Sequence, residues 1–221
     1  MYVVNKLPPQ IDATLLELLA RAEPATIGHF LHIGFMDPAI RALQRDVRIA
    51  GTAVPLRVPG PDGTIVHYAL GQVRPGDILV LDRCGDHKHA ACGGAVAYAA
   101  RKAGVLGVIV DGVVADLGEL RQYEMPVWAR GPSPITTKRC GLGGEFCVPV
   151  SCGGVAVAPG DAILADENGV LVLKPDQIEA AASRAIGLQT AERTTLARLD
   201  AGEKMPDISG ATRMVLDSLA T

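Results

Sequence analysis

The sequence predicts an α/β fold followed by C-terminal helices. Apolar, β-branched runs alternate with helical patterns, and the 25 glycines and 15 prolines lie between these runs instead of forming repeats. Hydrophobic residues make up 48% of the 221 residues, which is enough for a sizeable core and excludes intrinsic disorder. We therefore expect an α/β domain over residues 1–175 and a helical extension over residues 176–221 that packs on the domain or on a neighbouring subunit.

Local patterns justify the elements of the first half in turn. They predict a helix over 11–22, a short helix over 27–34, a strand over 47–58, a loop over 59–63, a strand ending at Asp82 and a helix over 93–103. The helices carry apolar residues at spacings of three and four, and Pro24 and Gly104 end two of them. The first strand is rich in β-branched residues, and we expect a bulge at Gly51.

The second half continues the alternation. It predicts strands over 105–110, 126–129 and 148–157, a helix over 116–123, a hairpin over 164–173, a long helix over 175–199 and a further helix from about 210. The run 105–110 is apolar throughout, as expected for a strand covered on both faces. In the hairpin, Asn168-Gly169 should supply the positive backbone angles of a tight turn. A long terminal helix with few partners in a small domain favours an oligomer.

A ten-residue pattern occurs twice, as VRPGDILVLD over 73–82 and as VAPGDAILAD over 157–166. In both copies a Pro-Gly-Asp turn leads into an apolar strand that ends on an aspartate. We interpret this pattern as a recurring turn and not as a duplicated domain, because ten residues are weak support for duplication.

Charge and cysteine content argue against several classes of protein. The net charge is −3 with acids and bases scattered, so the chain lacks the basic stripe of a nucleic-acid-binding protein. No apolar run approaches the ~20 residues of a membrane span, and the N-terminus has no signal-peptide pattern. The five cysteines show no CxxC spacing and indicate free thiols. We expect a cytoplasmic protein that acts on a small molecule. P-loop, Rossmann, HExxH and GxSxG motifs are absent from the sequence.

The densest group of reactive polar side chains is the run 83–89, between a buried strand and a helix start. In open α/β folds ligands bind beyond the carboxyl ends of the strands. Asp86, His87, Lys88 and His89 are therefore candidate catalytic residues, because histidine moves protons near neutral pH. Arg83 is a candidate substrate-binding residue. The alternative is a solvated polar loop without a catalytic role.

Two further features lie near this run. The glycines at 93 and 94 make the amides of a helix N-terminus approachable, which favours an anionic group such as a carboxylate. Asp116 follows the next strand, so the topology should bring it close to these amides, where it could hold a hard divalent cation. The alternative role for Asp116 is the N-cap of its own helix.

The order of these motifs resembles the RraA-like family over about residues 24–175. The stretches that carry the resemblance are the loop before the Gly93-Gly94 helix start, GVLGVIVDGVVAD, MPVWARG and VSCGGVAVAPGDAILADENGVLVL. Members include 4-hydroxy-4-methyl-2-oxoglutarate aldolases, which also decarboxylate oxaloacetate, and the regulator of ribonuclease E activity. The resemblance implies a swivelling α/β/α domain with mixed β-sheets, assembled as a homotrimer or homohexamer with active sites between subunits.

In the family's aldolases, a divalent metal and an arginine polarise a 2-oxo acid, so that carbon–carbon cleavage leaves an enolate. The resemblance implies Mg²⁺ or Mn²⁺ at Asp116. It also implies that the amides of Gly93, Gly94, Ala95 and Val96 bind the substrate carboxylate.

The sequence departs from the family pattern at three positions. Ala115 occupies the position of the arginine that precedes the metal aspartate, and Gly94 occupies the position of an acidic or amide residue at the helix start. His29 replaces an aspartate near the early helix, which makes His29 a candidate substrate-binding residue. Loss of the arginine would cost about 2.7–4 kcal/mol of barrier stabilisation if the same enolate forms. Arg130 is a candidate replacement that binds substrate, or an anchor for its strand end, and we favour anchoring.

These residues and the resemblance are compatible with three functions. The first is a metal-dependent lyase for a small oxo- or hydroxy-carboxylate. The second is another enzyme type on the same scaffold, such as an isomerase, dehydratase or ring-opening hydrolase that uses histidine. The third is a non-catalytic ring that binds a protein, and the dense histidine loop places it last.

Overall fold

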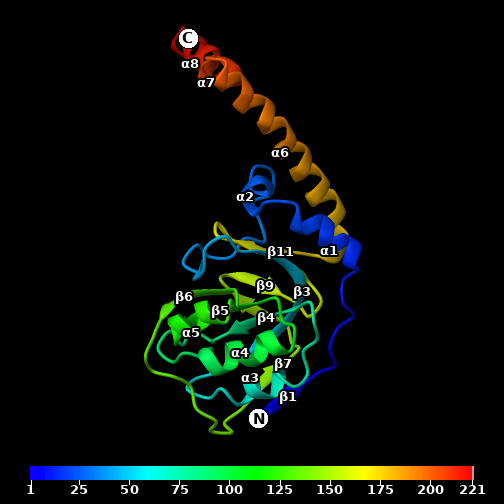
Figure 1. Cartoon of the computed structure of the whole chain (residues 1–221), viewed down its shortest axis with the longest axis vertical. Coiled ribbons are helices and arrows are strands. Elements are labelled where there is room, and N and C mark those ends of the chain that lie inside the picture. Colours follow the sequence, from blue (N-terminus) through cyan, green and yellow to red (C-terminus); the bar gives the residue numbers. More distant parts are fainter. Residues whose placement is uncertain (221) are drawn as a thin grey trace.

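The computed structural model describes residues 1–220 and contains a nine-stranded mixed sheet, helices on its faces and a projecting helical arm (Figure 1). The strands of this sheet are β1 (Tyr2–Val4), β2 (Arg41–Ala42), β3 (Arg48–Arg57), β4 (Asp77–Asp82), β5 (Gly107–Val114), β6 (Val127–Pro132), β7 (Gly144–Phe146), β10 (Ala162–Asp166) and β11 (Gly169–Leu173). Strand order is β1-β7-β3-β4-β5-β6-β2, and the β10–β11 hairpin also pairs with β3. A separate hairpin consists of β8 (Val150–Cys152) and β9 (Val155–Val157).

The helices surround this sheet and extend the chain beyond it. They are α1 (Ala13–Ala20), α2 (Pro24–Ile27), α3 (Thr64–Ala69), α4 (Gly94–Lys102), α5 (Leu117–Gln122), α6 (Ile178–Asp200), α7 (Met205–Ser209) and α8 (Ala211–Leu219), with a 3₁₀ turn at Pro175–Gln177. The mixed sheet and the C-terminal helices confirm the predicted fold class.

Four parallel strands, β3 to β6, form the centre of the sheet. Side chains along a strand alternate between its two faces. Leu79 and Leu81 of β4 pack with α3, α4 and α5 on one face. Ile78 and Val80 pack with the β8–β9 hairpin on the other. Both faces are buried, which explains the continuous apolar runs by which these strands were predicted.

The two copies of the repeated pattern adopt the same local structure. In each copy the aspartate of the Pro-Gly-Asp turn accepts, at its Oδ2, a hydrogen bond from the backbone N–H three residues earlier: Asp77 from Arg74 and Asp161 from Ala158, both at 2.8 Å. Strands β4 and β10, which these turns begin, both pair with β3. The interpretation as a recurring turn fits this geometry, because the strands are parallel and antiparallel to β3, respectively.

Several predicted elements were wrong. Residues 27–34 do not form a helix. The short helix of that region is α2, which ends at Ile27, and residues 28–30 form a turn. Residues 148–157 are not one strand but contain the β8–β9 hairpin, with Gly153 and Gly154 at φ 56° and 76°. Strand β5 continues past residue 110 to Val114 through a register shift.

Two local expectations about glycine were also wrong. Gly51 pairs without a register shift, so it forms no bulge. A Cβ at Gly51 would instead lie 2.7 Å from Gly76 O, so the glycine allows a close backbone approach. In the β10–β11 turn, Gly169 has a positive φ of 149°, but Asn168 does not.

The end of the chain forms an arm, which we define as residues 190–219. The first half of α6 packs with α1, α2 and the β10–β11 hairpin through Ile178, Ala182 and Ala185. The arm then extends away from the sheet, as Figure 1 shows. Its exposed apolar side chains are Leu196, Met205, Met214, Val215, Leu216 and Leu219.

The five cysteines are free, with Cys84 and Cys140 exposed and Cys92, Cys147 and Cys152 buried, which confirms the prediction of free thiols. Among residues 1–220, no helix is long and apolar enough to cross a membrane.

Candidate functional site

The candidate site lies at the amino end of α4. Parallel pairing of β4 with β5 places the chain after β5 beside the chain that leads into α4. Asp116 Oδ2 accepts a hydrogen bond from Gly94 N–H at 2.9 Å. The neighbouring Ala115 N–H donates to Cys92 O, also at 2.9 Å. The structure thus brings together the carboxylate and the amide that the sequence predicted to be close.

Asp116 does not cap its own helix. It occupies the N-cap position of α5, but its side chain makes no capping hydrogen bond there. Its backbone is left-handed, with φ 56° and ψ 45°, a conformation uncommon outside glycine and frequent at functional sites. The alternative role of Asp116 as N-cap of α5 is therefore wrong, because the carboxylate is directed at α4.

The two glycines at the start of α4 leave room for two carboxylates. A Cβ at Gly93 would lie 2.6 Å from Asp116 Oδ2. A Cβ at Gly94 would overlap Glu119 Oε2 and lie 3.0 Å from Glu119 Cβ. Side chains at these positions would therefore displace the carboxylates of Asp116 and Glu119 from the first turn of α4.

Glu119 is a site residue that sequence reasoning missed. It lies in the first turn of α5, three residues after Asp116. Residues three apart in a helix lie on the same face. The Asp-x-x-Glu spacing at a helix start was thus the available indication that both acids reach the same place.

The first turn of α4 can also bind an anion. The N–H groups of the first turn, which include those of Ala95 and Val96, have no acceptor within the helix. The aligned peptide dipoles add about half a positive charge at this end. The Ala95 side chain is exposed and that of Val96 is buried, so the turn is accessible along one side.

Asp86 organises the loop over residues 83–89. Its Oδ1 accepts hydrogen bonds from the N–H groups of Lys88 and His89 at 2.8 and 3.0 Å, and its Oδ2 lies 2.8 Å from His89 Nδ1. Burial by itself raises the pKa of Asp86, but these hydrogen bonds and the charge of Arg83 outweigh it and lower the pKa to about 2. Asp86 therefore stays ionised at neutral pH and positions His89, so it is poorly suited to transferring protons itself.

Arg83 is wholly buried beneath this loop. Its guanidinium donates to Val58 O at 2.6 Å, to Gly60 O at 2.7 Å and to His89 O at 3.2 Å. Burial lowers its pKa, and its Nε has no hydrogen-bond partner. The expected substrate-binding role does not fit this position. Arg83 lies two residues after Leu81 and faces the same side of the sheet, which strand alternation could have indicated.

The remaining loop side chains are accessible. His87 and Lys88 are exposed, and the His89 side chain is 26% exposed. An ionised carboxylate can only accept hydrogen bonds, so Nδ1 of His89 carries the hydrogen of the bond to Asp86, and Nε2 is the ring nitrogen left outside this bond. His89 lies only three positions before Cys92, so their Cα atoms lie within about 11 Å. The loop therefore stands close to the start of α4.

His29 and Arg130 lie elsewhere in this chain. His29 follows α2, in the layer that packs against α6. Arg130 donates from Nε to Asp111 Oδ1 at 2.6 Å and from Nη1 to Asp37 Oδ2 at 2.9 Å. Asp111 Oδ2 in turn accepts from Gly153 N–H at 2.7 Å. Arg130 thus anchors the end of β6 to β5 and to the β8–β9 turn, the role that we favour for it from the sequence.

The position at which the resemblance implies an arginine is closed in this chain. Ala115 is 4% exposed and packs in a small cluster with Ala90 and Val113. All three side chains are apolar, so this cluster offers no charge to a substrate.

The donor set fits a hard divalent cation. Asp116 and Glu119 offer carboxylate oxygens, the ligands that Mg²⁺ prefers. Among residues 1–220, no group of three or more His, Cys, Asp or Glu side chains could hold a metal. A cation here would therefore take its remaining ligands from water or substrate, which is the usual mode for Mg²⁺.

Comparison with known proteins defines the class. The family model described as RraA-like, Aldolase/RraA, matches residues 25–172. The chain therefore belongs to the RraA-like family, as its motifs predicted.

Two relatives in this family are named as candidate 4-hydroxy-4-methyl-2-oxoglutarate aldolases. The protein from Halalkalibacterium halodurans is 34% identical over 140 residues, which cover 63% of this chain and 66% of that protein. The one from Burkholderia multivorans is 39% identical over 137 residues, which cover 62% and 82%. The match thus spans slightly less than two thirds of the first relative.

Two similar solved structures are described as ribonuclease or RNA-processing inhibitors instead of aldolases. Streptomyces coelicolor RraAS2, described as an unusual member of the RNase ES inhibitor RraA family, matches with a TM-score of 0.76 at 25% identity, covering 85% of this chain and 99% of that one. RraA from Thermus thermophilis, described as an RNA-processing inhibitor, matches with a TM-score of 0.62 at 32% identity, covering 69% and 93%. The family therefore contains both named candidate aldolases and ribonuclease inhibitors.

Replacing Asp86 should loosen the 83–89 loop. Asp86→Ala removes the acceptor of two backbone N–H groups and leaves buried Arg83 without its carboxylate. The free energy of unfolding at pH 7, measured by urea denaturation, should fall by about 2–3 kcal/mol. The control His87→Ala, at an exposed position of the same loop, should stay within about 0.5 kcal/mol of the wild type.

The effect of Asp86→Ala should depend on pH. The folded pKa of about 2 lies below the ordinary aspartate value of about 3.9, so ionised Asp86 stabilises the fold. This contribution is fully present above about pH 5 and is lost as the pH falls toward 2. The stability difference from the wild type should shrink over that window, and a constant difference would contradict the assigned hydrogen bonds.

Proposed function

We propose that this chain is a divalent-metal-dependent lyase that acts on a small oxo- or hydroxy-carboxylate by retro-aldol cleavage or decarboxylation. The observation that carries the proposal is the pair of carboxylates at one helix N-terminus. The helix end offers about half a positive charge, whereas Asp116 and Glu119 bring two full negative charges. The excess negative charge favours a hard cation, Mg²⁺ or Mn²⁺.

Each part of the site has a distinct task in this proposal. The bound cation would act as a Lewis acid on the oxo group of the substrate. The amides of Ala95 and Val96 bind the substrate carboxylate, as helix N-termini bind anions. His89 Nε2 moves the proton that cleavage requires, and Asp86 holds the ring in the necessary tautomer. The exposed Lys88 is a cationic side chain on this loop that can approach a developing oxyanion.

Metal binding can be tested without turnover. In Mn²⁺ titrations followed by electron paramagnetic resonance, Asp116→Asn and Glu119→Gln should each weaken binding about tenfold, because each removes one charged ligand. Gly118→Ala is the matched control in α5, since no atom lies within 4 Å of its added Cβ.

Oxaloacetate and a 4-hydroxy-2-oxo diacid should both be tested with Mg²⁺, and activity should disappear with a chelator.

Two outcomes separate the parts of this proposal. Equal Mn²⁺ affinity in the wild type and Asp116→Asn would contradict the metal site. Normal Mn²⁺ binding without turnover of either acid would contradict the lyase, and would instead favour the binding function for which the RraA relatives are described.

The Asp86–His89 pair supports a second candidate, an enzyme of another type on the same scaffold, such as an isomerase, dehydratase or ring-opening hydrolase. A carboxylate-oriented imidazole is the usual arrangement for acid–base catalysis. His89→Gln should then reduce turnover at least 10²-fold, and a chelator should have no effect. His87 forms no side-chain hydrogen bond with Asp86, so the comparison variant His87→Gln should retain most activity. Sensitivity to the chelator would exclude this candidate.

We also propose that the chain assembles as a homotrimer or homohexamer and that the arm forms part of the contact between subunits. Val215 and Leu219, 58% and 77% exposed, are four residues apart on one stripe of α8 and would be covered by a neighbouring subunit. Light scattering should give a mass of three or six 23.0 kDa chains. Val215→Asp with Leu219→Asp should lower this mass, whereas Leu142→Asp, at an exposed position outside the arm, should not. A monomeric wild type would contradict the proposal.

A further inference from the structure

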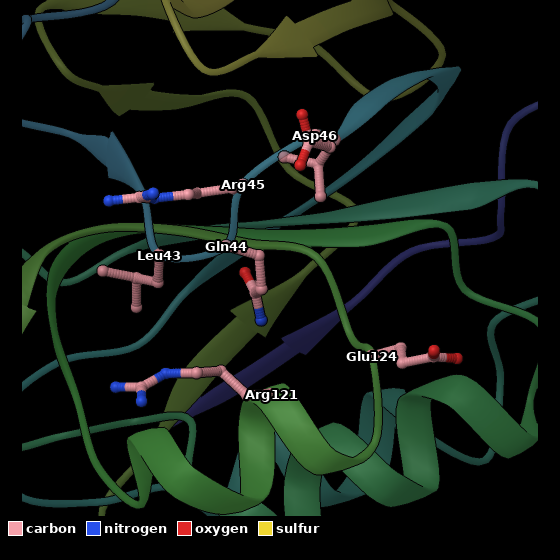
Figure 2. A pocket seen from close by; sticks show the side chains of 7 residues that line it. Leu43, Gln44, Arg45, Asp46, Arg121 and Glu124 are labelled. Carbon is pink, nitrogen blue, oxygen red and sulfur yellow. The ribbon is translucent and has the colours of Figure 1, made fainter.

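A cavity of about 710 Å³ lies at the sheet edge opposite the candidate site (Figure 2). It opens between the segment that joins β2 to β3 and the end of α5, near the amino end of β6. Its lining residues are Leu43, Gln44, Arg45, Asp46, Val47, Arg121 and Glu124. The volume is within the range of small-molecule sites. Neither the lyase proposal nor its alternatives use these residues.

The lining segment is firmly attached to its surroundings. Gln44 Nε2 donates to Met125 O at 2.5 Å, and Gln44 Oε1 accepts from Val127 N–H at 3.1 Å. Leu43 N–H donates to Val127 O at 2.9 Å. On the far side, Asp46 N–H donates to a carboxylate oxygen of Glu167 at 3.0 Å. These bonds fix the backbone from which the cavity's charged side chains extend.

The charges of the cavity are unevenly neutralised. Arg101 forms an ion pair with Glu124 at 3.0 Å, and Arg48, just outside the cavity, pairs with Glu23 at 3.1 Å. Within residues 1–220, neither Arg45 nor Arg121 has a carboxylate within 4.0 Å. Figure 2 shows both arginine side chains extending to the same side of the cavity, with Leu43 between them.

The opposite side of the cavity has a different character. Figure 2 shows Asp46 and Glu124 on the side away from the two guanidinium groups. Both residues hold a left-handed backbone, with φ 56° and 49°. Such conformations are uncommon outside glycine and occur preferentially at binding sites. A ligand that spans the cavity would thus meet two cations at one end and carboxylate acceptors at the other.

We propose that this cavity binds a phosphate monoester of a small polar molecule. A phosphate monoester carries about −1.5 to −2 charges at pH 7, which matches two unpaired guanidinium groups. Arginine also binds phosphate oxygens through paired N–H donors. Hydroxyl or amine groups of the same molecule would donate to Asp46 and Glu124. A dicarboxylate such as malonate carries a similar charge but spreads it over two groups, and it has no hydroxyl or amine to donate to Asp46 and Glu124, so it is the weaker match.

Isothermal titration calorimetry on the full chain tests this proposal. The probes are glycerol 3-phosphate, ribose 5-phosphate, inorganic phosphate and malonate, with ionic strength held constant by chloride. The phosphate monoesters should bind more tightly than inorganic phosphate, and malonate should bind most weakly. Arg45→Gln and Arg121→Gln should each weaken monoester binding about tenfold, because each removes one charge-assisted pair.

The control is Arg139→Gln, which removes an exposed arginine outside the cavity and should leave binding unchanged. An equal loss of binding in Arg139→Gln would overturn the proposal, because the phosphate would then follow the general charge of the surface. Tighter binding of malonate than of both monoesters would overturn the assignment to phosphate. Absence of monoester binding at millimolar concentration would overturn the site. All three arginines are exposed, so the variants should fold like the wild type.

Discussion

The close approach of the chain after β5 to the first turn of α4 is the constraint on which the rest of the site depends. The bond between Ala115 N–H and Cys92 O sets the two backbones side by side, and the left-handed Asp116 directs its carboxylate at Gly94 N–H. A side chain at Gly93 would clash with that carboxylate. The start of α4 must therefore lack side chains so that the acidic residues at the start of α5 can approach it. The glycine pair and the Asp-x-x-Glu spacing are thus one physical unit. That unit concentrates negative charge where a helix ends in partial positive charge.

The loop and the sheet edge use the same residue type for different purposes. Arg83 and Arg130 both lie near the carboxyl ends of strands, and both were candidate substrate-binding residues, although we favoured an anchoring role for Arg130. Arg83 is buried, and it fixes the loop that carries His89. Arg130 lies on the opposite face of the sheet and fastens β6 to Asp111. Side chains alternate along a strand, so whether a position is odd or even determines which face of the sheet its side chain lies on. The type of residue near a strand end does not determine this.

Sequence patterns predicted the elements that have their own periodicity. The central strands, α1, α4, the last hairpin and α6 are long enough to show it. Strands β1 and β7 have three residues each and pair with each other across about 140 residues of chain, so no local pattern can indicate them. The β8–β9 hairpin was recoverable, because Gly153-Gly154 interrupts its apolar run. For the site, strand topology was enough to place Asp116 beside Gly94. The Asp-x-x-Glu spacing indicates only that Glu119 shares the face of Asp116, and its approach to Gly94 depends on how α5 packs against α4.

The closed position at Ala115 changes what the site can offer to a developing negative charge. A guanidinium is charged at every pH that a protein survives, and its donors are fixed in a plane. Ala90 and Val113 pack against Ala115, and this cluster is apolar. The donors that remain nearby are the first-turn amides of α4, which are neutral and immobile, and the side chains of the 83–89 loop. Imidazole changes its charge near neutral pH. An imidazole of this loop could therefore take up and release a proton during a reaction, which a guanidinium could not.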